Sequence, residues 1–73
     1  MFDYVSKVCY EYNCFCSLDD DFVDTFDISS LYEEDLKNVV RRLSSELDDY
    51  YDIIFKFYRD KDFYCGKLMF FEL

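Results

Sequence analysis

LYEEDLKNVVRRLSSELDD, residues 31–49, is the stretch that decides the fold, because its apolar residues recur every three or four positions. That spacing lines one side of a helix and predicts an amphipathic helix from about Leu31 to Asp49. The apolar positions are Leu36, Val39, Val40, Leu43 and Leu47. Ser30 followed by Glu33 predicts a capping box at the start of this helix, since the two side chains can satisfy backbone N–H groups there.

The residues that follow alternate between apolar and polar side chains, which is the period of a strand with one buried face. This pattern predicts a strand over residues 51–59, a turn at Asp60–Asp62 and a second strand from Phe63 to Leu73. Gly66 is the only glycine and predicts a bulge in the second strand. The apolar residues near the C-terminus would need cover by a partner or a second copy if that strand formed an open edge.

The first thirty residues fit two patterns equally well. A helical stripe would contain Val5, Val8, Cys9, Tyr12 and Cys16, whereas strand alternation would contain Val8, Tyr10, Tyr12, Cys14 and Cys16. We favour a strand from about Tyr4 to Cys16, because Val, Tyr, Phe and Cys are frequent there and Ala and Leu are missing. A turn at Leu18–Asp20 and a strand near Phe22 to Ile28 would follow.

The expected fold is therefore a single α+β domain over residues 1–73. It has a small antiparallel sheet of about four strands (β-β-α-β-β) packed against one amphipathic helix. No apolar run approaches the roughly 20 residues that span a bilayer, and the N-terminus lacks the features of a signal peptide. We therefore expect a cytoplasmic protein with no membrane partner, in which the four cysteines are thiols.

The composition argues against catalysis. The chain has no His, so the usual general base and the commonest metal ligand are both missing. The aspartates between Asp19 and Asp27 lack the spacing and the central glycine of an EF-hand loop. The cysteines lack the paired spacing of a structural zinc site and are expected to be small buried hydrophobes; they are Cys9, Cys14, Cys16 and Cys65. We expect no enzyme activity, no cofactor and no metal.

The net charge of −9 comes from the first half of the chain. Residues 1–35 hold ten acids against Lys7 alone, whereas residues 36–73 hold seven residues of each sign. A solvated acidic loop would explain this asymmetry. Carboxylates held on a rigid scaffold would instead lie about 6–7 Å apart, a spacing comparable to that of nucleic-acid phosphates. The candidate partner-binding residues are Asp19, Asp20, Asp21, Asp24, Asp27, Glu33, Glu34 and Asp35.

In size, charge and aromatic content the chain resembles the small acidic phage-encoded anti-defence proteins, which include DNA mimics and anti-CRISPR inhibitors. Residues 21–29, DFVDTFDIS, are also similar to a strand of a small phage inhibitor of uracil-DNA glycosylase. The resemblance implies a non-enzymatic inhibitor. Such a protein would occupy the basic nucleic-acid-binding channel of a host nuclease complex, for example a CRISPR effector, without binding nucleic acid itself.

An interaction or regulatory module is the alternative expectation. It would act through the hydrophobic C-terminal strand, either by forming a homodimer or by adding a strand to a partner's sheet. Salt distinguishes the two expectations, because screening weakens contacts between exposed charges but not apolar strand pairing.

Overall fold

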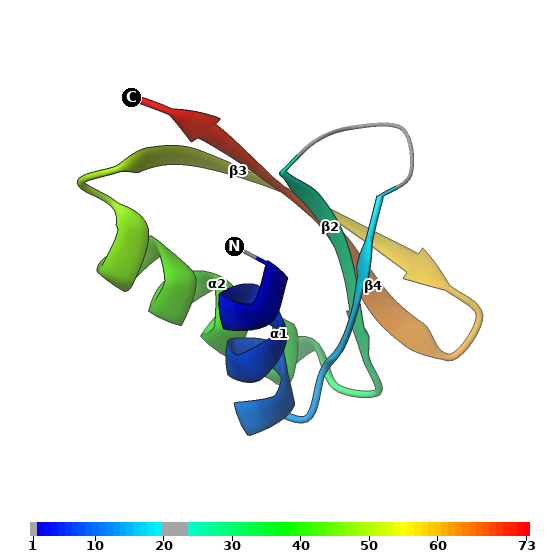
Figure 1. Ribbon diagram of the computed structural model, residues 1–73. Coiled ribbons are helices and arrows are strands. Elements are labelled where there is room, and N and C mark those ends of the chain that lie inside the picture. Colours follow the sequence, from blue (N-terminus) through cyan, green and yellow to red (C-terminus); the bar gives the residue numbers. More distant parts are fainter. Residues whose placement is uncertain (1, 20–23) are drawn as a thin grey trace.

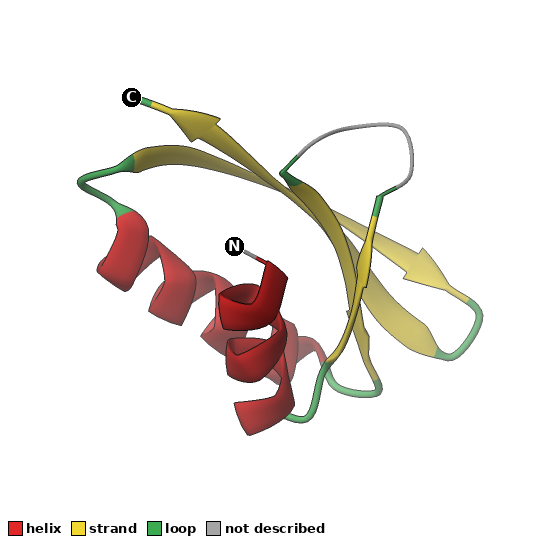
Figure 2. Ribbon diagram, viewed as in Figure 1, coloured by secondary structure: helices red, strands yellow, loops and turns green. Residues whose placement is uncertain are grey.

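Two helices and four strands follow one another in the computed structural model, which describes residues 2–19 and 24–73. They are α1 (Phe2–Glu11), β1 (Phe15–Leu18), β2 (Thr25–Ser30), α2 (Glu33–Leu47), β3 (Tyr51–Asp60) and β4 (Phe63–Glu72). Both helices lie on the same side of the curved sheet, and its other face is open (Figures 1 and 2). The α+β class and the four-stranded antiparallel sheet are confirmed. The expected element order is wrong, because a helix precedes the first strand.

The strands are arranged in the order β1-β2-β4-β3, and all neighbouring strands are antiparallel. β4 is therefore an inner strand, hydrogen-bonded to β2 on one side and to β3 on the other. β1 and β3 form the two edges of the sheet. The C-terminal strand does not form an open edge, and the long edge strand is β3.

The segment expected to be a strand from Tyr4 to Cys16 is instead α1 followed by the short strand β1. Val5, Val8 and Cys9 are at most 2% exposed, which is the burial pattern of one helix face, whereas Tyr10 is 83% exposed. The strand predicted from the β-prone composition is wrong, because packing against the rest of the core overrides weak intrinsic propensities. The strand expected at Phe22–Ile28 is β2, which begins at Thr25; residues 20–23 lie outside the described part of the chain.

The helix α2 begins two residues later than expected and ends at Leu47. Leu36, Val39 and Leu43 are buried from it. The expected capping box does not form, because Tyr32 is the N-cap residue and makes no side-chain cap. The Ser30 hydroxyl instead accepts a hydrogen bond from the Tyr32 N–H at 3.3 Å and lies 3.4 Å from Asp35 Oδ2, to which it can donate.

Gly66 lies in a regular part of the sheet, so the expected bulge is absent. It is directly opposite Ile28 on β2 and Phe57 on β3, without a break in either register. A Cβ atom at this position would overlap the ring of Phe55. The glycine therefore makes room for an aromatic side chain on the neighbouring strand.

The hydrophobic core lies between the helices and the sheet, where Phe26, Ile28 and Leu68 from the inner strands are almost fully buried. Aromatic rings extend it, since Phe26 packs edge-on against Phe70 and stacks with Phe2 of α1. Cys9, Cys14 and Cys65 are buried, as expected for small hydrophobes, and Cys16 is half-buried. Within residues 2–19 and 24–73 no helix has the length and apolar character needed to cross a membrane.

Candidate interaction site

The fold divides the acidic residues that the sequence groups together. Asp24 immediately precedes β2, whereas Glu33, Glu34 and Asp35 begin α2 after the far end of that strand. A six-residue strand spans about 20 Å, so the two groups lie at opposite ends of the domain. Asp20 and Asp21 lie outside the described residues.

Asp19 and Asp27 both face the same lysine. The Asp19 Oδ2 atom lies 2.7 Å from Lys67 Nζ, and the Asp19 side chain is only 7% exposed. Asp27 is directly opposite Lys67 in the β2–β4 register and is half-buried. The hydrogen bond to Asp19 raises the pKa of Lys67, and the nearby charge of Asp27 adds to this effect. These two carboxylates are thus part of an internal charge cluster on the open face of the sheet.

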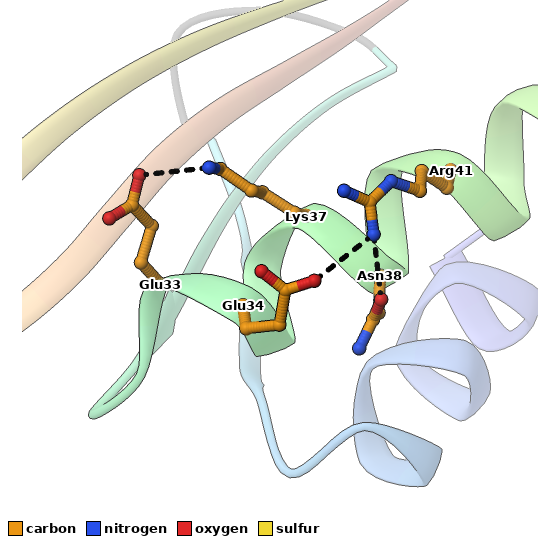
Figure 3. Close-up of polar contacts among 5 residues, drawn as sticks. All are labelled: Glu33, Glu34, Lys37, Asn38 and Arg41. Atoms are coloured by element: carbon orange, nitrogen blue, oxygen red, sulfur yellow. Dashed lines mark hydrogen bonds and ion pairs between the residues drawn. The ribbon is translucent and has the colours of Figure 1, made fainter.

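Two of the acids at the start of α2, Glu33 and Glu34, form ion pairs with basic residues one to two turns further along the same helix (Figure 3). Glu33 pairs with Lys37 at 3.3 Å, and Glu34 pairs with Arg41 at 3.2 Å. Arg41 also donates a hydrogen bond to Asn38 at 3.0 Å. All four charged side chains remain about half exposed or more, so a partner can still reach them.

A second group of acids lies at the other end of the domain, where the termini and the α2–β3 connection are found (Figure 1). The backbone N–H of Phe70 bonds to Asp24 O at 3.1 Å, and that of Leu73 bonds to Tyr50 O at 3.2 Å. Within the described ranges no Lys or Arg forms an ion pair with any of this group. We call it the acidic end; its residues are Asp3, Asp24, Asp48, Asp49 and Glu72.

The acidic end was missed in the sequence because its members come from separate elements. Only Asp24 belongs to the candidate set, and Asp3 and Glu72 stand in no local run of charge. The topology places them at one end of the domain, since α1, β2 and β3 begin where α2 and β4 finish. A signal was nevertheless present in the dipeptide Asp48-Asp49, which follows the helix with no basic residue in its last turn.

An open hollow of about 590 Å³ lies at the acidic end. Tyr50 is 66% exposed and Leu73 is 79% exposed, so aromatic and apolar surface lies beside the carboxylates. Aromatic faces next to carboxylates are suited to bind a guanidinium or ammonium group. The hollow is lined by Tyr4, Leu47, Asp49, Tyr50, Tyr51, Glu72 and Leu73.

The position of Asp48 and Asp49 is unfavourable for the helix. Asp48 is the C-cap residue of α2, where unpaired backbone carbonyls give the helix its negative end. An acid near this end costs about 0.3–1 kcal/mol when exposed.

No protein-family model matches the chain, and no curated protein or solved structure matches it either. The geometry of the site itself is therefore the basis for assigning a function. Across residues 2–19 and 24–73, no group of three or more His, Cys, Asp or Glu side chains is arranged to hold a metal ion.

Proposed function

We propose that this protein is a non-enzymatic inhibitor that occupies the basic nucleic-acid-binding channel of a host defence enzyme, with CRISPR effectors as the target class. One observation carries the proposal. Asp49 and Glu72, from separate parts of the chain, line a hollow together with three tyrosines, and no Lys or Arg of the described residues forms an ion pair with either carboxylate.

Electrostatics explains how such a surface would find its target. Channels that hold nucleic acid are rich in Arg and Lys, which contact the phosphates. A single-sign group of carboxylates attracts these residues over long range and speeds association. The net charge of −9 adds to the same attraction.

The hollow would supply the specific contact. An arginine of the target can enter it, stack on the exposed ring of Tyr50 and bond to the carboxylates of Asp49 and Glu72. Buried arginine and tyrosine contacts are typical of the few residues that dominate binding energy. In this proposal the contacts in the hollow supply most of the binding free energy, and the surrounding acids increase the rate of association.

The residues singled out by sequence keep a secondary part in this proposal. Asp24 belongs to the acidic end, and Glu33 and Glu34 can exchange Lys37 and Arg41 for basic residues of the target. Strand addition at the hydrophobic C-terminal strand has less support, because β4 already has a neighbour on each side.

Capture of target proteins by neutralised variants tests the proposal. The acidic-end variant is Asp48→Asn/Asp49→Asn/Glu72→Gln, and the matched control is Glu11→Gln/Asp60→Asn/Asp62→Asn, which removes the same charge from exposed acids that have no part in the proposed contact. We expect the wild type and the control to capture a nucleic-acid-binding enzyme from host lysate at low salt, and the acidic-end variant to lose it. Equal capture by all three proteins, or capture unaffected by salt, would overturn the proposal.

A further inference from the structure

β3 is a long and regular edge strand. Its ten residues pair with β4 in one unbroken register, and none of the described residues pairs with its other side. Ile54 and Phe57 on this strand are 42% and 44% exposed. An exposed strand edge of this kind is a template for pairing with another strand.

The helix side of this edge is also open. An open groove of about 290 Å³ runs between α2 and β3. Its floor includes the rings of Phe55 and Phe57, and its wall includes Val40 and Arg41 of the helix. A strand added beside β3 would place its own apolar side chains against this groove.

We propose that β3 pairs antiparallel with β3 of a second copy of this chain, joining two four-stranded sheets into one. A two-fold axis perpendicular to the sheet relates the copies, so facing residues lie on the same side of the joined sheet. Both helix layers then cover the same face. The two acidic ends point in opposite directions along the antiparallel strands, which keeps them apart and available to partners.

The charges on β3 select the register. When Ile54 faces Ile54 of the second copy, Asp52 faces Lys56, and symmetry forms this opposite-charge pair twice. On the helix side the same register brings Ile53 opposite Phe55 and Tyr51 opposite Phe57. The register centred on Lys56 would instead set Lys56 against Lys56 and Asp52 against Asp60, and like charges directly opposite each other are destabilising.

The charges on β3 complement those of the same strand in antiparallel orientation, which indicates that the added strand belongs to a second copy of the chain. Asp52 and Lys56 lie two residues either side of Ile54 on the open face of the sheet, and both are exposed. Among the described residues neither forms an ion pair within the chain. In the antiparallel pair, Asp52 of each copy therefore faces Lys56 of the other copy.

Sedimentation equilibrium of the full chain across a concentration series tests the proposal. The wild type is expected to approach twice its monomer mass of 9.0 kDa. Asp52→Lys and Lys56→Asp each replace two attractive pairs by two repulsive ones and should weaken the dimer about tenfold or more. The double variant Asp52→Lys/Lys56→Asp restores opposite charges and should recover the dimer.

Lys61→Asp is the matched control, because it changes the net charge as Lys56→Asp does but lies in the turn after β3. Circular dichroism shows whether each variant is folded. Ile54→Lys provides a second disruption at an exposed position that should not disturb the core. A wild type that stays monomeric up to its solubility limit, or a dimer that the charge swaps leave unchanged, would overturn the proposal.

Discussion

Lys67 Nζ of β4 lies 2.7 Å from Asp19 Oδ2, although β2 separates β4 from β1, the strand that Asp19 follows. The pair therefore crosses an entire strand on the open face of the sheet. Its acidic member is 7% exposed and its basic member 34% exposed. Asp19, one of the candidate partner-binding residues, is therefore engaged in an ion pair within the chain.

Replacing Lys67 by Met should lower the stability of the fold. The substitution removes the ion pair between Lys67 and the nearly buried carboxylate of Asp19, and losing a charge-assisted hydrogen bond at a buried carboxylate is unfavourable. Thermal unfolding should show a clear fall in Tm for Lys67→Met, and little change for the control Lys7→Met at an exposed position on α1. Equal Tm values for the two variants would contradict a structural role for the pair.

The N-terminal helix makes a matched pair of substitutions informative. Val8 is 2% exposed on α1 and Tyr10 is 83% exposed. Val8→Ala should lower the free energy of unfolding by about 2–3 kcal/mol, and Tyr10→Ala should change it by less than about 0.5 kcal/mol. A strand would place both side chains on one face, so similar losses in urea unfolding would contradict the helix.

Gly66 and Phe55 should be energetically coupled. Gly66→Ala places a methyl group where the Phe55 ring lies, and overpacking of this kind costs about 1–3 kcal/mol. Shortening the neighbour in Gly66→Ala/Phe55→Leu removes the overlap, so the double variant should lose less than the sum of the single losses. Chemical denaturation of the four proteins measures the coupling, and strict additivity would show that the ring moves away freely.

Stability should fall at alkaline pH because of Cys14. Burial raises the pKa of its thiol from 9.0 to about 11. Because the folded state holds this proton more tightly, its contribution is complete below pH 9 and is lost as the pH rises from 9 towards 11. Urea unfolding under reducing conditions should show a smaller alkaline loss for Cys14→Ala than for the wild type. Parallel pH profiles would contradict this assignment.

The sequence predicted the elements whose periodicity is long and unambiguous. Leu36, Val39 and Leu43 mark α2 by their spacing alone, and the alternation from Tyr51 onwards marks β3. The segment containing Val8 could not be assigned in this way. Its short stripe fits both periods, and only packing against the rest of the core decides between them.

The candidate site was predicted less well than the fold. Glu33 and Glu34 stand in a run without bases, yet the helix turn brings Lys37 and Arg41 to them. Asp49 and Glu72 are far apart in the sequence but line one hollow. The distribution of charge along the sequence predicts neither the ion pairs nor the shared hollow, because both depend on how the chain folds.

Competition with nucleic acid for a captured target is the most direct test of the proposed function. The target's affinity for this protein is measured with and without the nucleic acid that the target binds. If the acidic end occupies the same basic channel, the two ligands exclude each other, and the acidic-end variant Asp48→Asn/Asp49→Asn/Glu72→Gln no longer competes. A stable complex containing target, nucleic acid and this protein together would contradict the account.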